Sequence, residues 1–172
     1  EIVVERVSAK EDFPGVTVDT DEGISGVGES GLSARELAVM GGIEHFKPLL
    51  IGQDASRIEH LWQLMYRGHF YPPGREKLHA LGALDLALWD IRGKALGRPL
   101  HELFGGLTRD HVECYSTAFP SRGTLRETAR ACIEAGFRAI RIGVADPERG
   151  ALAEEAARYG RFLGVAASLS IA

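Results

Sequence analysis

The chain has 172 residues, of which 45% are hydrophobic and 26% are charged, a composition typical of a globular protein with one good core or two small ones. Its formal net charge of -4 argues against a nucleic-acid or anionic-membrane surface, because such a surface needs a clustered basic excess. No apolar run approaches the roughly 18 to 20 residues that a membrane span requires.

The cysteine content and the first residues of the chain bear on the cellular compartment expected for the protein. Only Cys114 and Cys132 are present, without paired spacing, which favours a reduced, cytoplasmic environment. No tripartite secretory leader opens the chain, and the sequence lacks an initiator Met, so we expect some N-terminal residues to be missing. Partners are expected to be small molecules or proteins.

The first 27 residues predict a small antiparallel meander. Three short apolar runs have the length and composition of strands: residues 2–4, 16–18 and 24–27. Acidic residues followed by Gly23 predict a turn between the last two, because this pattern suits a tight hairpin connection.

Two helices and a loop are predicted next. Apolar residues cluster at helical spacing over 33–50, where Pro48 is expected to end the helix and the glycine pair 41–42 weakens it. A second helix is predicted over 56–65, and the glycines and prolines of 66–75 predict a loop. A three-stranded sheet followed by helices makes an α+β domain.

The segment from Ala80 to Gly105 is the most informative of the chain. Apolar residues around it recur every three or four positions and predict a helix with one broad apolar face: Leu78, Leu81, Leu84, Leu88, Ile91 and Ala95. Gly97 accepts a left-handed cap and Pro99 cannot continue a helix, so the helix is expected to end near Leu96.

After Gly105 the pattern alternates between strands and helices. The predicted elements are a strand over 112–117, a helix over 124–135, a strand over 139–142, a helix over 151–162 and a strand over 165–171. Such alternation predicts a parallel sheet, but length and periodicity do not separate a doubly wound sheet from a barrel.

The segment containing the third helix closely resembles the signature of the mandelate racemase and muconate lactonizing enzyme family, within the enolase superfamily. The matching residues are Ala80, Gly82, Ala83, Leu84, Asp85, Ala87, Asp90, Ile91, Gly93, Lys94, Pro99, Leu100, Leu103, Phe104 and Gly105. Residues 21–29 resemble the hairpin of the family's N-terminal domain, and residues 136–141 resemble the beginning of its second barrel strand.

The resemblance implies two domains. Residues 1–106 would form an α+β N-terminal capping domain, with a three-stranded antiparallel sheet plus helices. Residues 107–172 would be the first two to three β/α units of a (β/α)8 TIM-type barrel. That barrel is incomplete in this chain, because about 60 residues cannot close a barrel that normally needs about 250.

In the family that this chain resembles, Mg2+ held by three carboxylates stabilises the enediolate formed when a base removes the proton next to a substrate carboxylate. A side chain alone cannot ionise so weak a carbon acid, so a divalent cation must neutralise the developing charge. The family's metal ligands lie on the third to fifth barrel strands. No metal ligand is therefore assigned in this chain, and the Mg2+ ligands are expected beyond residue 172.

Arg141 is the catalytic candidate. Many family members place Lys-x-Lys at the end of the second barrel strand, where the second lysine acts as a base, but this chain reads Arg141-Ile142-Gly143. Arginine stays protonated, so Arg141 either grips a carboxylate in the active site or forms a structural ion pair. This difference from Lys-x-Lys favours the acid-sugar dehydratase branch of the family. In that branch a later histidine, paired with an aspartate, serves as the base.

The loop from Arg67 to Arg75 resembles the cap segment of galactonate, mannonate and related sugar-acid dehydratases. The candidate substrate contacts are His69, Tyr71 and Arg75 in this loop, with Asp12 and Phe13 between the first two strands, where the family carries its other specificity loop. The alternative is an exposed loop that packs on a neighbouring subunit.

Other charged and glycine residues are expected to be structural. Asp85 and Asp90 lie about 140 degrees apart around a helix, so salt bridges or caps to Arg92, Lys94 or the barrel are predicted rather than a shared metal. Gly26 and Gly28 are predicted to form a turn and a bend, because a nucleotide fingerprint would need a third glycine and a following helix.

These observations together predict a Mg2+-dependent sugar-acid dehydratase that binds a small acid sugar and, by resemblance, forms a homo-oligomer. A racemase, epimerase or cycloisomerase of the same family is the alternative among enzymes. A catalytically inactive fragment or interaction module is the alternative of a different class, and the 172 residues by themselves are expected to be inactive.

Overall fold

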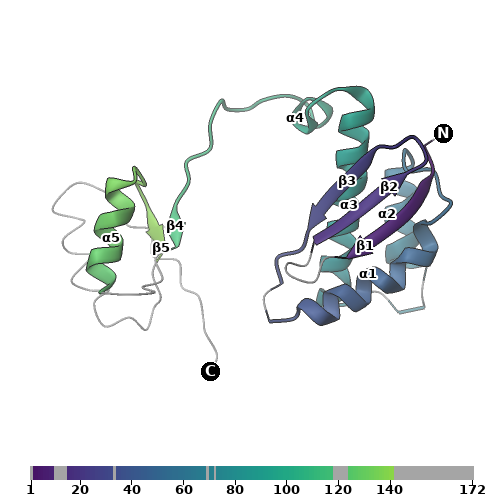
Figure 1. Ribbon diagram of the computed structural model, residues 1–172, viewed down its shortest axis with the longest axis horizontal. Coiled ribbons are helices and arrows are strands. Elements are labelled where there is room, and N and C mark those ends of the chain that lie inside the picture. The colour runs from purple at the N-terminus through teal and green to yellow at the C-terminus, as the bar shows by residue number, and fades with distance from the viewer. Residues whose placement is uncertain are drawn as a thin grey trace. The chain divides into compact units, whose positions relative to one another are not determined.

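The computed structural model describes residues 2–9, 15–32, 34–68, 70–71, 73–117 and 124–141. The chain divides into two compact units, Glu1–Thr108 and Arg109–Ala172 (Figure 1). The first unit holds, in order, β1 (Val4–Ala9), β2 (Gly15–Thr20), β3 (Ser25–Glu29), α1 (Glu36–Leu50), α2 (Ile58–Arg67), α3 (Arg75–Leu96) and α4 (Leu100–Leu103). The second unit holds β4 (Ser116–Thr117), α5 (Leu125–Glu134) and β5 (Ile140–Arg141). Among the described helices, none combines the length and apolar character needed to cross a membrane.

The sheet of the first unit is an antiparallel meander in the order β1-β2-β3, as predicted. The strands predicted around 16–18 and 24–27 are confirmed. The first strand, predicted at 2–4, instead runs from Val4 to Ala9. A register irregularity between Val4 and Arg6 explains the difference, because it turns Val4 and Val7, three positions apart, toward the same buried face.

Helices α1, α2 and α3 lie over one face of this sheet (Figure 1). The glycine pair in α1 does not interrupt the helix. A Cβ on Gly42 would lie 2.9 Å from the Cβ of Ala80 on α3, whereas Gly41 has nothing within 4 Å. Pro48, predicted to end α1, lies inside its last turn, and the helix continues to the buried Leu50.

The second helix begins and ends later than predicted, so the predicted loop is shorter. Tyr66 stacks on Trp62 one turn earlier, with ring centroids 4.9 Å apart, and the helix ends only at Arg67. At the other end of the loop, Arg75 is already the first residue of α3.

Helix α3 ends at Leu96 as predicted, and Gly97 adopts the left-handed conformation with φ 62°. Its buried face differs in part from the predicted stripe. Leu81, Leu84, Leu88 and Ile91 are buried, but Leu78 is 41% exposed and Ala95 is exposed. The alanines of α3 are buried instead: Ala80, Ala83 and Ala87.

The close approach of β3 to α3 explains why small residues are buried there. A Cβ on Gly26 would collide with the carbonyl oxygen of Ala87, and one on Gly28 with that of Ala83. The strand backbone therefore rests directly on the helix backbone, with no side chain between them. The prediction of a turn and a bend at these glycines is wrong, since both lie within the strand.

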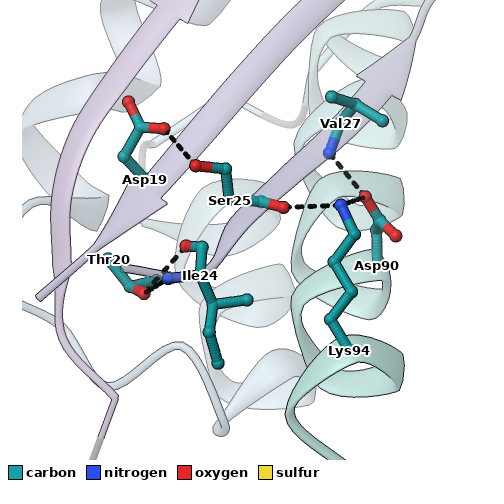
Figure 2. A network of polar contacts seen from close by, with 7 residues as sticks. All are labelled: Asp19, Thr20, Ile24, Ser25, Val27, Asp90 and Lys94. Atoms are coloured by element: carbon teal, nitrogen blue, oxygen red, sulfur yellow. Dashed lines mark hydrogen bonds and ion pairs between the residues drawn. The ribbon is translucent and has the colours of Figure 1, made fainter. Parts of the chain in front are cut away.

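Two charged residues of α3 cover the outer edge of β3 (Figure 2). The Asp90 carboxylate accepts a hydrogen bond from the Val27 backbone N–H at 2.9 Å and forms an ion pair with Lys94 at 2.8 Å. Lys94 also donates to the Ser25 carbonyl oxygen at 2.7 Å. Edge-strand groups that β2 cannot reach are thus satisfied by the helix, and the predicted salt bridge of Asp90 is confirmed.

The second unit is a β-α-β arrangement with parallel strands, as predicted. Both strands begin later than predicted, since β4 begins at Ser116 and β5 at Ile140. Thr124 begins α5 with a reciprocal capping box to Glu127. The helix predicted over 151–162 and the strand over 165–171 lie outside the described residues.

Gly28→Ala tests the contact between β3 and α3. The added methyl group must push the strand away from the helix, so we expect a loss of about 3 kcal/mol in the free energy of unfolding. Urea denaturation followed by far-UV circular dichroism measures it.

Gly82→Ala on the exposed side of α3 is the matched control. Nothing lies within 4 Å of a Cβ there, so alanine should stabilise the helix by about 1 kcal/mol. Equal effects of the two substitutions would contradict the proposed close contact.

Candidate functional site

The carboxyl ends of β4 and β5 bring the predicted catalytic residue to a sheet edge. The strands pair in parallel, with Thr117 opposite Arg141 and Ser116 opposite Ile140. Ligand sites of parallel α/β structures lie outside the carboxyl ends of the strands. Thr117 and Arg141 are thus neighbours across this ladder, and Thr117 was not singled out from the sequence.

Arg141 makes no ion pair within the described ranges, and both its predicted roles stay predictions. Ile140 is buried, whereas Arg141 is partly exposed, as alternation along a strand requires. The ion pair in this part of the unit is made by Arg138, which lies 3.5 Å from Glu113.

Helix α5 holds this pair of strands in place. The Cys132 thiol donates a hydrogen bond to the Ser116 hydroxyl at 3.3 Å, and Ala129 on the same helix is buried. At the start of α5, the backbone N–H of Thr124 donates to the Glu127 carboxylate and holds the pKa of Glu127 below its ordinary value. The helix is thereby fixed at its start and against β4.

The loop between α2 and α3 presents two aromatic rings. Tyr71 is 78% exposed and Phe70 is 93% exposed, and their rings meet edge to face at 5.0 Å. Only Tyr71 was predicted from the sequence. Phe70 could have been found from its position next to Tyr71 in the predicted loop, which contains glycine and proline residues. The predicted contacts His69, Asp12 and Phe13 lie outside the described residues.

Arg75 occupies an electrostatically unfavourable position. It is the first residue of the 22-residue helix α3, where the helix dipole favours an anion, and no described residue forms an ion pair with it. The neighbouring Glu76 is instead paired with Arg35 at 2.9 Å. The Arg75 guanidinium and the helix N-terminus would both attract a carboxylate.

Asp85 does not form the predicted salt bridge to Arg92 or Lys94, and a salt bridge or cap to the barrel stays a prediction. This partly buried carboxylate on α3 forms no ion pair within the described part of the chain. Burial, and secondarily the negative charge of Glu59, raise the pKa of Asp85 above its ordinary value.

The described residues do not form a metal site. Across the described ranges, no three His, Cys, Asp or Glu side chains converge on a position that could bind a metal ion. These residues do not supply the three carboxylates that Mg2+ would need.

Comparison with known proteins places these features in context. The family described as "Mandelate racemase / muconate lactonizing enzyme, N-terminal domain" matches residues 5–105. A D-mannonate dehydratase from Rhizorhabdus wittichii is 44% identical over 138 residues, which are 78% of this chain and 34% of that protein. A D-galactonate dehydratase family member from Halomonas elongata is 41% identical over 138 residues, again 78% and 34%. The chain thus spans about a third of the length of these relatives.

Solved structures agree in fold. A putative dehydratase from Salmonella is similar with a TM-score of 0.76 and 28% identity, over 83% of this chain and 43% of that one. An enolase from Pantoea ananatis, solved with bound D-gluconate and Mg, is similar with a TM-score of 0.67 and 34% identity, over 81% and 35%.

Asp85→Asn is expected to raise the melting temperature at neutral pH. Because folding raises the pKa of Asp85, the unfolded chain ionises first as the pH rises, and the wild-type protein loses stability up to the pKa of the folded state. The advantage of the variant should vanish near pH ~3, where both states are protonated. Thermal denaturation by circular dichroism at both pH values measures it.

Asp19→Asn is the control, for which we expect the opposite change, a lower melting temperature at neutral pH. Hydrogen bonds from Ser25 and Arg6 lower the pKa of Asp19, so its contribution is present at neutral pH and is lost as the pH falls through the pKa of the folded state. A lower melting temperature of Asp85→Asn at neutral pH would contradict the unpaired state of Asp85.

Proposed function

The chain belongs to the mandelate racemase / muconate lactonizing enzyme family, and from this premise we propose that the protein it represents is a sugar-acid dehydratase. The reaction removes the proton next to the carboxylate of a polyhydroxy acid and expels the β-hydroxyl as water, which leaves a 2-keto-3-deoxy acid. The similarity to relatives named D-mannonate and D-galactonate dehydratases carries this proposal.

Arg141 would hold the reacting carboxylate. Its guanidinium can donate two parallel hydrogen bonds to a carboxylate, and it stays protonated throughout. When the neighbouring proton is removed, negative charge grows on the carboxylate oxygens, so a fixed cation there stabilises the transition state more than the ground state. Arg141 therefore assists proton removal without acting as the base.

Mg2+ would supply the larger part of this charge stabilisation when bound, as in enolase-type sites. The residues within the described ranges do not fit it, so its ligands and the general base would come from other parts of the protein.

The loop between α2 and α3 would select the substrate. Exposed Phe70 and Tyr71 offer an apolar edge to the C–H face of a sugar chain, and the Tyr71 hydroxyl offers a hydrogen bond. The unpaired Arg75 would add a cation for an acidic or hydroxylated end of the substrate. A polyhydroxy acid of hexonic type combines these groups.

The first test is turnover of the whole protein that contains this chain, with Mg2+, on a panel of D-mannonate, D-galactonate and D-gluconate. We expect formation of a 2-keto-3-deoxy acid, detected as its semicarbazone. Conversion of one epimer into another without loss of water would favour a racemase or epimerase. A complete lack of turnover and of bound Mg2+ would favour an inactive interaction module.

Arg141→Ala in that protein is expected to lower kcat by about 100-fold or more, which is typical of losing one preorganised charge-stabilising donor. Arg141→Lys should restore part of the loss because it keeps the charge but not the fork. Arg138→Ala is the matched control, since Arg138 pairs with Glu113, and should leave kcat unchanged. Equal losses in the Arg138 and Arg141 variants would contradict the assigned role.

Tyr71→Ala is expected to raise KM about three- to tenfold with little change in kcat, because an aromatic contact on a remote part of the substrate is worth about 1 kcal/mol. Leu37→Ala, an equally exposed apolar residue on α1, should leave KM unchanged. Steady-state kinetics on the preferred acid measures both, and an unchanged KM in the Tyr71 variant would remove this loop from the substrate site.

A further inference from the structure

One flank of α3 follows the free edge of β3 with matching spacing. Asp90 and Lys94 are four residues apart on the helix, which corresponds to a rise of about 6 Å. Their partners Val27 and Ser25 are two residues apart on the strand, which corresponds to about 6.6 Å. Because the two spacings nearly match, consecutive turns of one helix face can contact consecutive outward positions of the strand (Figure 2).

The contacts on this edge occupy groups that another strand would need. The sheet order is β1-β2-β3, and no strand of the described residues lies beyond β3. The outward Val27 N–H donates to the Asp90 carboxylate at 2.9 Å, and the outward Ser25 carbonyl oxygen accepts from Lys94 at 2.7 Å. The Asp90 oxygen that accepts from Val27 also pairs with Lys94 at 2.8 Å. One donor and one acceptor of the edge are thus held inside the molecule.

Apolar side chains next to this edge favour pairing with another chain. Val27 is 55% exposed, and Leu86, one turn before Asp90 on α3, is 49% exposed. The strand itself is slender, since Gly26 and Gly28 are two of its five residues. A free strand edge with exposed apolar neighbours is a template for a strand of another molecule.

The stability that the ion pair adds does not account for the arrangement. The side chains of Lys94 and Asp90 are 49% and 27% exposed. Ion pairs this exposed contribute between about 0 and 1 kcal/mol to the free energy of unfolding. A role in excluding a partner depends on which groups are occupied, and a contact of low energy is sufficient for it.

The strand that fits this edge is β3 of a second copy. In an antiparallel pair centred on Val27, each copy donates its Val27 N–H to the Val27 carbonyl oxygen of the other. Ser25 of one copy then lies opposite Glu29 of the other, so no like charges meet and the serine hydroxyl can donate to the carboxylate. The edge is therefore complementary to itself.

We propose that Asp90 and Lys94 keep the edge of β3 closed to β3 of a second copy. Asp90 occupies the Val27 N–H, which is the central donor of that pairing, and Lys94 occupies the neighbouring Ser25 carbonyl oxygen. The two side chains thus prevent self-association through this strand, in addition to satisfying its backbone groups. The proposal is independent of the dehydratase activity proposed above.

The double variant Asp90→Ala/Lys94→Ala of the 172-residue chain tests this proposal. We expect it to keep the far-UV circular dichroism of the wild type and to self-associate at least tenfold more tightly in sedimentation equilibrium. The Val27 amide should also become more protected from hydrogen exchange as the protein concentration rises. In the wild type this protection should not depend on concentration, because Asp90 of the same molecule holds the amide.

Two further variants identify the surface involved. Val27→Pro, added to the double variant, removes the central N–H at an outward edge position, where proline is tolerated, and should abolish the gained self-association. Arg98→Ala/Glu102→Ala removes an ion pair of the same spacing, 2.9 Å long, that does not contact β3, and should stay within threefold of the wild type. A folded double variant without gained self-association, association that survives Val27→Pro, or unfolding of the double variant would overturn the proposal. The last result would show that the pair is required for folding itself.

Discussion

The direct contact between the backbones of β3 and α3 is the constraint on which the rest of the first unit depends. Gly26 and Gly28 leave no room for a side chain above the carbonyl groups of Ala87 and Ala83. This contact fixes the height and direction of the long helix over the sheet. Gly42 of α1 then meets the same helix at Ala80, so glycine contacts set the distance of α3 from both β3 and α1.

Two of the acidic residues of α3, Asp85 and Asp90, lie in different surroundings. Asp90 faces the edge of β3, where a backbone N–H and Lys94 satisfy it, and it completes the packing. Asp85, less than two turns earlier, has no ion pair within the described residues, and burial and the charge of Glu59 raise its pKa. Of these two carboxylates, only Asp90 thus stabilises the packing of the described part of the chain.

The second unit depends on a different constraint, the parallel ladder of β4 and β5. Pairing in this direction brings the carboxyl ends of both strands to one edge, so Thr117 and Arg141 become neighbours although 24 positions separate them. The thiol of Cys132 and the capped start of α5 hold the helix that makes the crossover. A cation held at such an edge suits chemistry on an anionic substrate.

The sequence by itself determined the three-stranded meander, the three long helices of the first unit, the β-α-β order of residues 116–141 and the end of α3 before Gly97, because periodicity, glycine caps and β/α alternation are local properties. The same local patterns misjudged the first strand, the role of Pro48 and the conformation at Gly26 and Gly28. Only the tertiary structure decided those, along with the close approach of β3 to α3. The reason is physical: whether a carboxylate is paired or a glycine is needed depends on atoms that distant segments bring within a few ångströms, and spacing along the chain does not record that distance.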